Sequence, residues 1–180
     1  MAGEQQCRNM RREWNLTSPC VAEGVAVSAA LNPTNDDWRS HLVHDFAGIR
    51  RVLNETRRIA VLGIKIEESA APAFYVPEYA QQAGFEIVPV PVYYPDVTEI
   101  LGERVYRTIA EIPGPIDMVN VFRRPDHIPA HVDDILAKRP KSVWFQLGIR
   151  NDKAAEQLAR AGIDVVQDSC LMVELQHVGK

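Results

Sequence analysis

Five short runs of mostly apolar residues recur in the second part of this chain, and they constrain its fold more than any other feature. The runs are IAVLGI (59–64), FEIVPVPV (85–92), IDMVNVF (116–122), SVWFQLGI (142–149) and DVVQD (164–168). Strands that are buried on both faces of a parallel sheet have this composition. We therefore predict five strands, one at each run.

Helical patterns lie between most of these runs. They are PAFYVPEYAQQAG (72–84), PAHVDDILAKRP (129–140) and NDKAAEQLARAG (151–162). The first ends at Gly84, a residue type common just after a helix, and the third begins at the capping residue Asn151. For the second, Asp126 can serve as the N-cap, with Pro129 in the first turn. The intervening segment 99–114 is short and turn-rich.

The alternation of strands and helices predicts an α/β fold. Parallel strands that are joined by right-handed crossovers give a doubly wound parallel sheet of about five strands in three layers. Pro89 and Pro91 in the second run each lack a backbone N–H. We therefore expect that strand to fray or to lie near an edge of the sheet.

The segment 32–56 shows a different pattern. Trp38, Leu42, Phe46, Ile49 and Leu53 recur every three or four residues. This spacing predicts one amphipathic helix of about four to five turns, capped by Asn35. Residues 1–31 show neither the helical nor the strand periodicity of apolar residues. We therefore predict a loosely ordered extension at 1–31 and a single domain at 32–180.

Composition excludes several partners. The formal net charge of −4 at pH 7 provides no basic field for nucleic acid. No apolar run approaches the ~18 residues that a membrane span needs, and the N-terminus is a poor secretory signal, so a cytoplasmic location is expected. The three cysteines are widely spaced and odd in number, which argues against both a disulfide framework and a zinc site.

In a doubly wound sheet, ligands bind beyond the carboxyl ends of the strands. Gly63 follows the first predicted strand and can take a positive φ, which lets a ligand approach the backbone. Lys65 places an ammonium group nearby, so the pair suits a phosphate. The alternative for this loop alone is a plain turn with an exposed lysine.

This loop does not have the dinucleotide fingerprint. It contains one glycine where GxGxxG needs three, and the second strand has no acidic residue at its end for a ribose hydroxyl. These two absences disfavour NAD binding. There is no GK[ST] P-loop either.

Polar residues also follow the third and fourth predicted strands. Arg123 and Arg124 can clamp phosphates through their planar donor forks. The alternative is a solvated pair in a loop, and this role suits Arg124 better than Arg123. Gln146 and Gly148 can meet amide and phosphate groups of a ligand. Their alternative roles are an internal hydrogen bond for Gln146 and a simple chain turn at Gly148.

Catalytic and metal-binding candidates are few. His41 and His44 are three residues apart without an evident acidic partner, and a capping or surface role suits His127 better than ligand contact. No serine occupies a nucleophile elbow. Cys170 follows the fifth strand and could lie at the rim of a ligand site, although a buried structural thiol is the favoured interpretation. Nothing in the sequence marks it as a nucleophile. We therefore expect no catalytic residues and no metal site.

Four stretches of the chain resemble the small stand-alone CoA-binding proteins, whose domain is related to the CoA-binding domain of the succinyl-CoA synthetase α subunit. The stretches are RRIAVLGIK, AGFEIVPVPVYYPDVTEILGERVY, AEIPGPIDMVNVFRRPDHIP and KSVWFQLGIRNDKAAEQLARAGIDVVQDSCLMVE. The resemblance extends from about Asn35 to Glu174. It implies a Rossmann-like fold that binds coenzyme A across the carboxyl edge of the sheet.

The resemblance also implies a role for individual positions. Gly63, Ile64 and Lys65 would face the nucleotide phosphates. The adenosine and pantetheine path would be lined by Pro91, Val92, Val121, Phe122 and Arg123, and the other side would be closed by Gln146 and Gly148.

The sequence departs from the family pattern in three places. IKIEES follows the first glycine where many relatives have a Ser- or Asn-Pro-rich loop, Val-Pro-Val replaces Val-Asn-Pro, and Ser169 replaces an arginine. Glu67 and Glu68 would repel phosphates if they faced inward, so we expect them to point outward. These changes bear on affinity and ligand identity more than on the fold.

Three functions are compatible with these observations. The first is a non-catalytic protein that binds CoA or an acyl-CoA as its partner. The second is an NAD(P)-dependent oxidoreductase, which the missing glycines and ribose acid oppose. The third is an interaction or regulatory module that has kept the fold and lost the ligand. The sequence leaves a homodimer open.

Overall fold

The computed structural model describes residues 37–180. The predicted extension at 1–31 and the predicted cap Asn35 lie outside the described residues. Within residues 37–180, no helix is long and apolar enough to cross a membrane.

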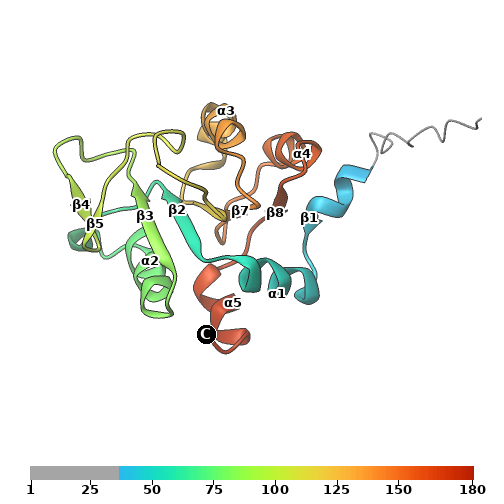
Figure 1. Ribbon diagram of the computed structural model, residues 1–180, viewed down its shortest axis with the longest axis horizontal. Helices are drawn as coiled ribbons and strands as arrows, with labels where there is room; N and C mark the ends of the chain where they lie inside the picture. Colours follow the sequence, from blue (N-terminus) through green and yellow to red (C-terminus); the bar gives the residue numbers. More distant parts are fainter. Residues whose placement is uncertain (1–36) are drawn as a thin grey trace, which may run out of the picture. The chain divides into compact units, whose positions relative to one another are not determined.

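The centre of the domain is a parallel sheet in the order β1-β8-β7-β6-β2-β3 (Figure 1). All five strand pairs in this sheet are parallel. The strands are β1 (Leu42–Val43), β2 (Arg58–Leu62), β3 (Glu86–Val90), β6 (Met118–Val121), β7 (Ser142–Phe145) and β8 (Asp164–Val166). The predicted Rossmann-like, doubly wound parallel sheet is confirmed, and it has six strands in place of about five.

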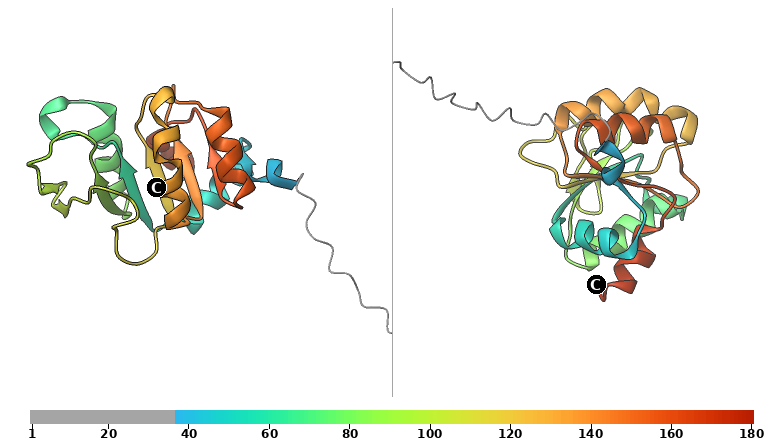
Figure 2. Two further views of the ribbon diagram at one scale, coloured as in Figure 1. Left: turned by 90° about the horizontal axis from the view of Figure 1, so that it is seen from above. Right: turned by 90° about the vertical axis from the view of Figure 1, so that its right-hand side faces the viewer.

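Helices cover both faces of the sheet, as the end-on view in Figure 2 shows. One face carries α1 (Phe46–Glu55), α2 (Pro72–Gln82) and α5 (Leu171–His177), and the other carries α3 (Pro129–Lys138) and α4 (Asp152–Arg160). Because successive side chains of a strand point to opposite faces, Val61 packs into the core under α1, α2 and α5, while Leu62 packs under α3 and α4. The sheet and the helices on its two faces therefore form the predicted three layers, with one apolar core on each side of the sheet.

The single long helix predicted for 32–56 is wrong. The chain instead forms a short 3-10 helix, η1 (Asp37–His41), then β1, and only then α1, which is capped by Asp45 through a 2.7 Å bond from the Gly48 N–H. Trp38 and Leu42 pack against the core under α3 and α4, whereas Ile49 and Leu53 pack in the core on the opposite face. One straight helix cannot reach both faces, so the chain breaks where it passes the edge of the sheet.

Strand β3 lies at the edge of the sheet, as Pro89 and Pro91 predicted. The turn-rich segment after it contains a small antiparallel hairpin, β4 (Glu99–Ile100) and β5 (Glu103–Arg104). The Tyr106 N–H then donates to the Pro89 carbonyl at 2.9 Å, so the returning chain partly covers the edge.

Two of the three residues that were predicted to mark helix starts do so. Asn151 caps α4 by accepting from the Ala154 N–H at 3.0 Å, and Pro129 occupies the first turn of α3. Asp126 does not cap α3, because it lies inside the short 3-10 helix η3 (Pro125–His127) and Ile128 precedes the helix. The C-terminal helix α5 was not predicted.

Candidate functional site

The candidate site lies where the direction of the sheet order reverses, between β2 and β6. From β2 the chain continues outward to β3, and from β6 it continues the other way to β7 and β8. In doubly wound folds such a switch point opens a crevice at the carboxyl ends of the strands. Gly63 and Phe122, the residues that follow β2 and β6, meet at this point.

Gly63 is required here by the backbone of its neighbour. Its φ is +86°, and a Cβ at this position would lie 2.5 Å from the Phe122 carbonyl oxygen. The Gly63 N–H donates to Val90 and the Phe122 N–H donates to Leu62, each at 2.8 Å. The predicted positive φ is present, and the group that approaches the glycine in this structure is Phe122.

A cavity of about 480 Å³ opens beside this crossing, on the α2 and α5 side; we call it the first cavity. Most of its wall is apolar, and its basic residues are Lys65, Arg123 and Arg124. No aspartate or glutamate lines it. The full lining is Lys65, Ala71, Pro72, Ala73, Tyr75, Val76, Phe122, Arg123, Arg124, Pro125, Gln146, Leu147, Gly148, Ile149, Cys170 and Met172.

Arg123 and Lys65 are partly buried, whereas Arg124 is exposed, and Arg123 has a buried nitrogen atom. Its side chain is partly buried, and its Nε has no hydrogen-bond partner. Its Nη2 lies 3.4 Å from the His127 Nδ1, and its guanidinium carbon lies 5.7 Å from the centre of the Tyr93 ring. Within residues 37–180 it forms no ion pair with a carboxylate. A partly desolvated cation of this kind favours an anionic ligand.

A second cavity, of about 510 Å³, lies between the loop after β3 and helix α3. It is lined by Leu62, Pro91, Val92, Tyr93, Pro95, Arg107, Thr108, Ala130, His131 and Asp134. Two of its charged groups are already engaged. Arg107 donates to the carbonyls of Tyr94, Pro95 and Val97, and Asp134 accepts from the backbone N–H groups of Ile109 and Ala110.

His131 lies in the wall of the second cavity, and its pKa is lowered. Burial lowers the pKa of His131 below its usual 6.5, and the charge of Arg123 lowers it further. Asp134 opposes this shift, and His127 adds to it. The imidazole is therefore neutral over more of the physiological range than an exposed histidine would be.

The sequence-predicted residues divide among three places. Lys65, Phe122, Arg123, Gln146 and Gly148 line the first cavity, and Pro91 and Val92 line the second. Gly63, Ile64 and Val121 line neither of these two cavities. Ile64 and Val121 are buried in the cores on opposite faces, so only their backbone is available to a ligand at this edge.

Gln146 holds an internal hydrogen-bond network beneath the first cavity. Its Oε1 accepts from the Leu171 N–H at 3.3 Å, and its Nε2 donates to the Asn120 Oδ1 at 2.9 Å. Since a backbone N–H can only donate, it fixes the orientation of both amides and leaves the buried Asn120 Nδ2 without an acceptor. Gln146 therefore joins β7 to the start of α5.

The Gly148 N–H is also committed within the protein. It donates to the Asp168 Oδ1 at 2.7 Å, and Gly148 has a φ of +77°. Gly148 therefore turns the chain here, and because it also lines the first cavity, its predicted contact with a ligand stays a prediction.

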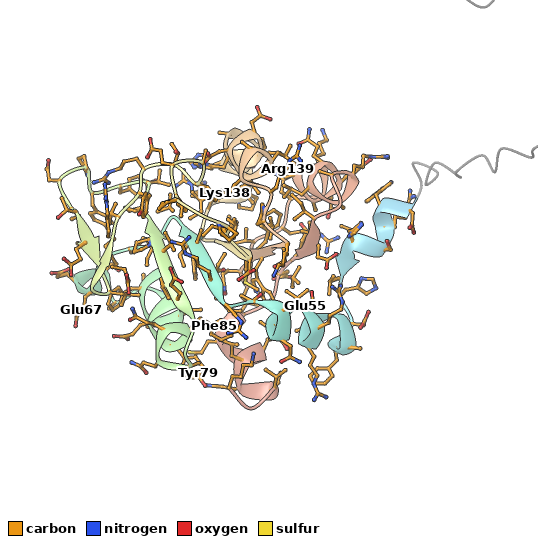
Figure 3. The ribbon with its side chains drawn as sticks, viewed as in Figure 1. Glu55, Glu67, Tyr79, Phe85, Lys138 and Arg139 are labelled. Atoms are coloured by element: carbon orange, nitrogen blue, oxygen red, sulfur yellow. The ribbon has the colours of Figure 1, made fainter. Side chains whose placement is uncertain are left out.

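Glu67 and Glu68 lie away from both cavities. They line a separate hollow with Glu78 and Glu99, which we call the acidic hollow, next to the β4–β5 hairpin. Figure 3 shows Glu67 at this side of the molecule. The expectation that these two carboxylates point away from a phosphate site at Lys65 agrees with this placement.

Several lining residues were not found from the sequence. Tyr75 and Val76 of α2 and Met172 of α5 supply apolar wall, and His131 comes from α3. Cys170, expected to be a buried thiol, is partly exposed and lines the first cavity. The helical period of α2 and α3 was visible, but which turn faces a cavity depends on how each helix docks.

No group of three potential metal ligands is found in the part of the chain that the structure describes. His41 and His44 do not form a pair. The His41 Nδ1 lies 2.7 Å from an Asp164 carboxylate oxygen, and the His44 Nδ1 lies 2.9 Å from the Leu42 carbonyl oxygen.

Comparison with known proteins agrees with this geometry. The family described as "CoA binding domain" matches residues 57–176. The uncharacterized protein YneT of Bacillus subtilis (strain 168) is 35% identical over 127 residues, which cover 71% of this chain and 91% of YneT.

Two solved structures are similar to this chain in both sequence and fold. A Thermus thermophilus protein, cell-free ID.343, is 36% identical, with a TM-score of 0.69 over 75% of this chain and 99% of its own. A hypothetical protein from Pyrococcus horikoshii OT3 is 28% identical, with a TM-score of 0.68 over 75% of this chain and 92% of its own. The chain belongs to the CoA-binding domain family.

Proposed function

We propose that this protein binds coenzyme A or an acyl-CoA at the carboxyl edge of its sheet and catalyses no reaction of its own. The observation that carries the proposal is the first cavity, where Lys65, Arg123 and Arg124 meet an apolar wall that contains no carboxylate. Membership of the CoA-binding domain family supports the same ligand class.

The chemistry of the cavity matches the two halves of such a ligand. Arg123 provides a planar donor fork and Lys65 a compact ammonium group, and both suit phosphate oxygens. The side chains of Tyr75, Val76 and Met172 provide apolar surface for the uncharged pantetheine arm or an acyl chain. A ligand with phosphates at one end and apolar groups at the other satisfies both.

The remaining family positions contribute in different ways. Ile64 would act through its backbone, because its side chain is in the core. Pro91 and Val92 would extend the binding surface toward the second cavity. Gly63 and Gln146 would act indirectly, by allowing the β2–β6 crossing and by holding the start of α5.

The proposal that the protein is not an enzyme rests on the composition of the first cavity. Acid–base catalysis needs a titratable group positioned within reach of the reacting atoms. The lining contains no histidine, aspartate or glutamate. Its titratable side chains are Lys65, Tyr75 and Cys170. We assign Lys65 to phosphate binding and Tyr75 to the apolar wall, and Cys170 has no histidine beside it in that wall. We also propose a cytoplasmic location, as expected from the sequence.

The test is calorimetric titration of the purified protein with CoA and with acetyl-CoA. We expect saturable binding, and about tenfold weaker binding for Lys65→Met, which keeps the length of the side chain and removes its charge. Lys153→Met, on the exposed face of α4, is the matched control and should bind as the wild type does.

Absence of heat with millimolar CoA would refute the proposal. In that case mass spectrometry of small molecules released from the purified protein, and titration with NADH, would show whether another nucleotide occupies the site. A protein that carries no small molecule and binds neither compound would instead be a module that has lost its ligand.

A further inference from the structure

Arg123 forms the boundary between the two cavities. Its side chain lines the first cavity, while its guanidinium lies over Tyr93, which lines the second. Two histidines lie near it. His127 contacts its Nη2 at 3.4 Å, and His131 is near enough for the charge of Arg123 to lower its pKa.

These three groups come together because of one local turn. After β6 the chain forms the 3-10 helix η3, in which the His127 N–H donates to the Arg124 carbonyl at 2.9 Å. The His131 N–H then donates to Ile128, also at 2.9 Å, as α3 begins. The turn returns His127 and His131 toward Arg123. Both imidazoles and the guanidinium can therefore donate hydrogen bonds into one region.

The positive charge around His131 is incompletely balanced. Arg123 has no carboxylate partner among residues 37–180, and Arg107 bonds only to carbonyl oxygens through its side chain. The single carboxylate on the wall of the second cavity belongs to Asp134, and its oxygens already accept two backbone N–H groups. An anion that entered here would meet three potential donors and one acid.

We propose that Arg123, His127 and His131 bind a phosphate monoester, and specifically the 3′-phosphate of coenzyme A. The inference rests on the proposed function and deepens it, because it assigns one phosphate of the ligand to one group of residues. Lys65, on the first-cavity side, is left to contact the diphosphate.

The chemistry favours a monoester over a diester. A phosphate monoester carries up to two negative charges near neutral pH and offers three acceptor oxygens. Arg123 and its two neighbouring histidines supply three donors for that group, whereas a phosphodiester carries one charge. The cost of bringing Arg123, His127 and His131 together in the free protein is offset when the dianion binds among them.

Proton uptake is the expected signature. In the free protein, burial, Arg123 and His127 lower the pKa of His131, against the opposing effect of Asp134. Arg107 and Tyr93 also face this region from the loop side. A bound dianion would raise the pKa of His131 again, so binding of the monoester should strengthen as the pH falls toward 6.5.

The experiment compares CoA with dephospho-CoA, which lacks only the 3′-phosphate. Dissociation constants for both are measured by calorimetry at pH 6.5 and pH 8.5. We expect CoA to bind about tenfold more tightly than dephospho-CoA at pH 6.5. The preference should shrink at pH 8.5, because His131 takes up a proton less readily there.

Two variants test the assignment, with thermal melting as the check on folding. His131→Asn and His127→Asn should each reduce the preference for CoA, and His131→Asn should also remove its pH dependence. His44→Asn, in the turn between β1 and α1, is the matched control and should behave as the wild type does. If His131→Asn fails to fold, the preference for CoA measured with His127→Asn decides the test, because His127 is exposed.

The possible failures are distinct. If CoA and dephospho-CoA bind equally well, the phosphate assignment is refuted while the proposed function stands. A preference that persists unchanged in both histidine variants refutes it as well. If neither compound binds, the proposed function itself fails and the assignment falls with it.

Discussion

Gly63 and Phe122 cross so closely that a Cβ on Gly63 would lie 2.5 Å from the Phe122 carbonyl oxygen and 3.1 Å from the Cδ of Arg123. The two residues directly follow neighbouring strands at the switch point of the sheet. Their contact fixes where Arg123 leaves the backbone. The position of the proposed phosphate-binding groups therefore depends on Gly63, although this residue has no side chain to contact the ligand.

Gly63→Ala tests this dependence. The methyl group must displace the Phe122 carbonyl, and alanine is strained at a φ of +86°. We expect the free energy of unfolding to fall by about 2 kcal/mol or more, with weaker CoA binding because Arg123 moves. Chemical denaturation and calorimetry measure the two effects. Gly162→Ala, which has a similar φ of +79° and open space around it, separates strain from clash; equal losses in the two variants would contradict the argument.

Gln146→Leu tests whether Gln146 is structural. Leucine leaves the Leu171 N–H and the Asn120 side chain without their partners in a buried region. We expect a loss of about 1–3 kcal/mol in the free energy of unfolding, and a change of less than about threefold in CoA affinity. The exposed Gln157→Leu is the control. A variant of unchanged stability that binds CoA more than tenfold weaker would show a direct ligand contact instead.

Asp117→Asn tests a carboxylate at the amino ends of the strands, on the side of the sheet opposite the candidate site. Burial raises the pKa of Asp117, but the bond from Lys141 and the backbone N–H groups of Arg58 and Arg57 outweigh it and hold the pKa below 3.8. A lowered folded-state pKa stabilises the protein above the unfolded-state pKa, and that stabilisation is lost as the pH falls through the folded-state value.

We therefore expect Asp117→Asn to lower the free energy of unfolding by about 1–3 kcal/mol at pH 7 and to reduce its dependence on pH below about 4. Urea denaturation as a function of pH measures both. The exposed Asp133→Asn should leave both unchanged. CoA affinity at pH 7 should not change, because Asp117 precedes β6 whereas both cavities adjoin the other end of that strand. A steeper acid dependence in Asp117→Asn would contradict the sign.

Glu67→Gln and Glu68→Gln test the outward placement of the acidic residues. Both line the acidic hollow and neither lines the cavity that contains Lys65. Exposed charges are strongly screened at physiological salt, so we expect CoA affinity to change by less than about twofold in each variant. Calorimetry at 150 mM salt measures this. An increase of tenfold would mean that these carboxylates repel the bound phosphates.

The fold could largely be predicted because its signals are local or compositional. Doubly buried strands need continuous apolar runs, and Gly84, Pro129 and Asn151 mark helix ends through their own backbone or capping chemistry. The segment 32–56 failed for the opposite reason. Its spacing suits one helix, but Leu42 packs against the core on one face of the sheet and Ile49 is buried in the core on the other, which no local signal reveals.

The candidate site was predicted in outline. Lys65, Arg123, Gln146 and Gly148 follow three parallel strands, so the topology alone brings them to one edge. Their individual roles were not predictable, because Gln146 and Gly148 could bond either inward or to a ligand. The positions of Asp168 and Leu171 decide this, and both come from a later part of the chain.

The sequence by itself determined the parallel sheet, its carboxyl edge and the basic residues there, because strand burial and chain connectivity follow from local composition. Only the tertiary structure decided that Gly63 makes room for Phe122, that Glu67 turns toward a separate hollow, and that His127 and His131 return to Arg123. These depend on contacts between segments whose separation in the chain carries no local signal. The packing of η3, α2 and α5 at the end of the sheet fixes them.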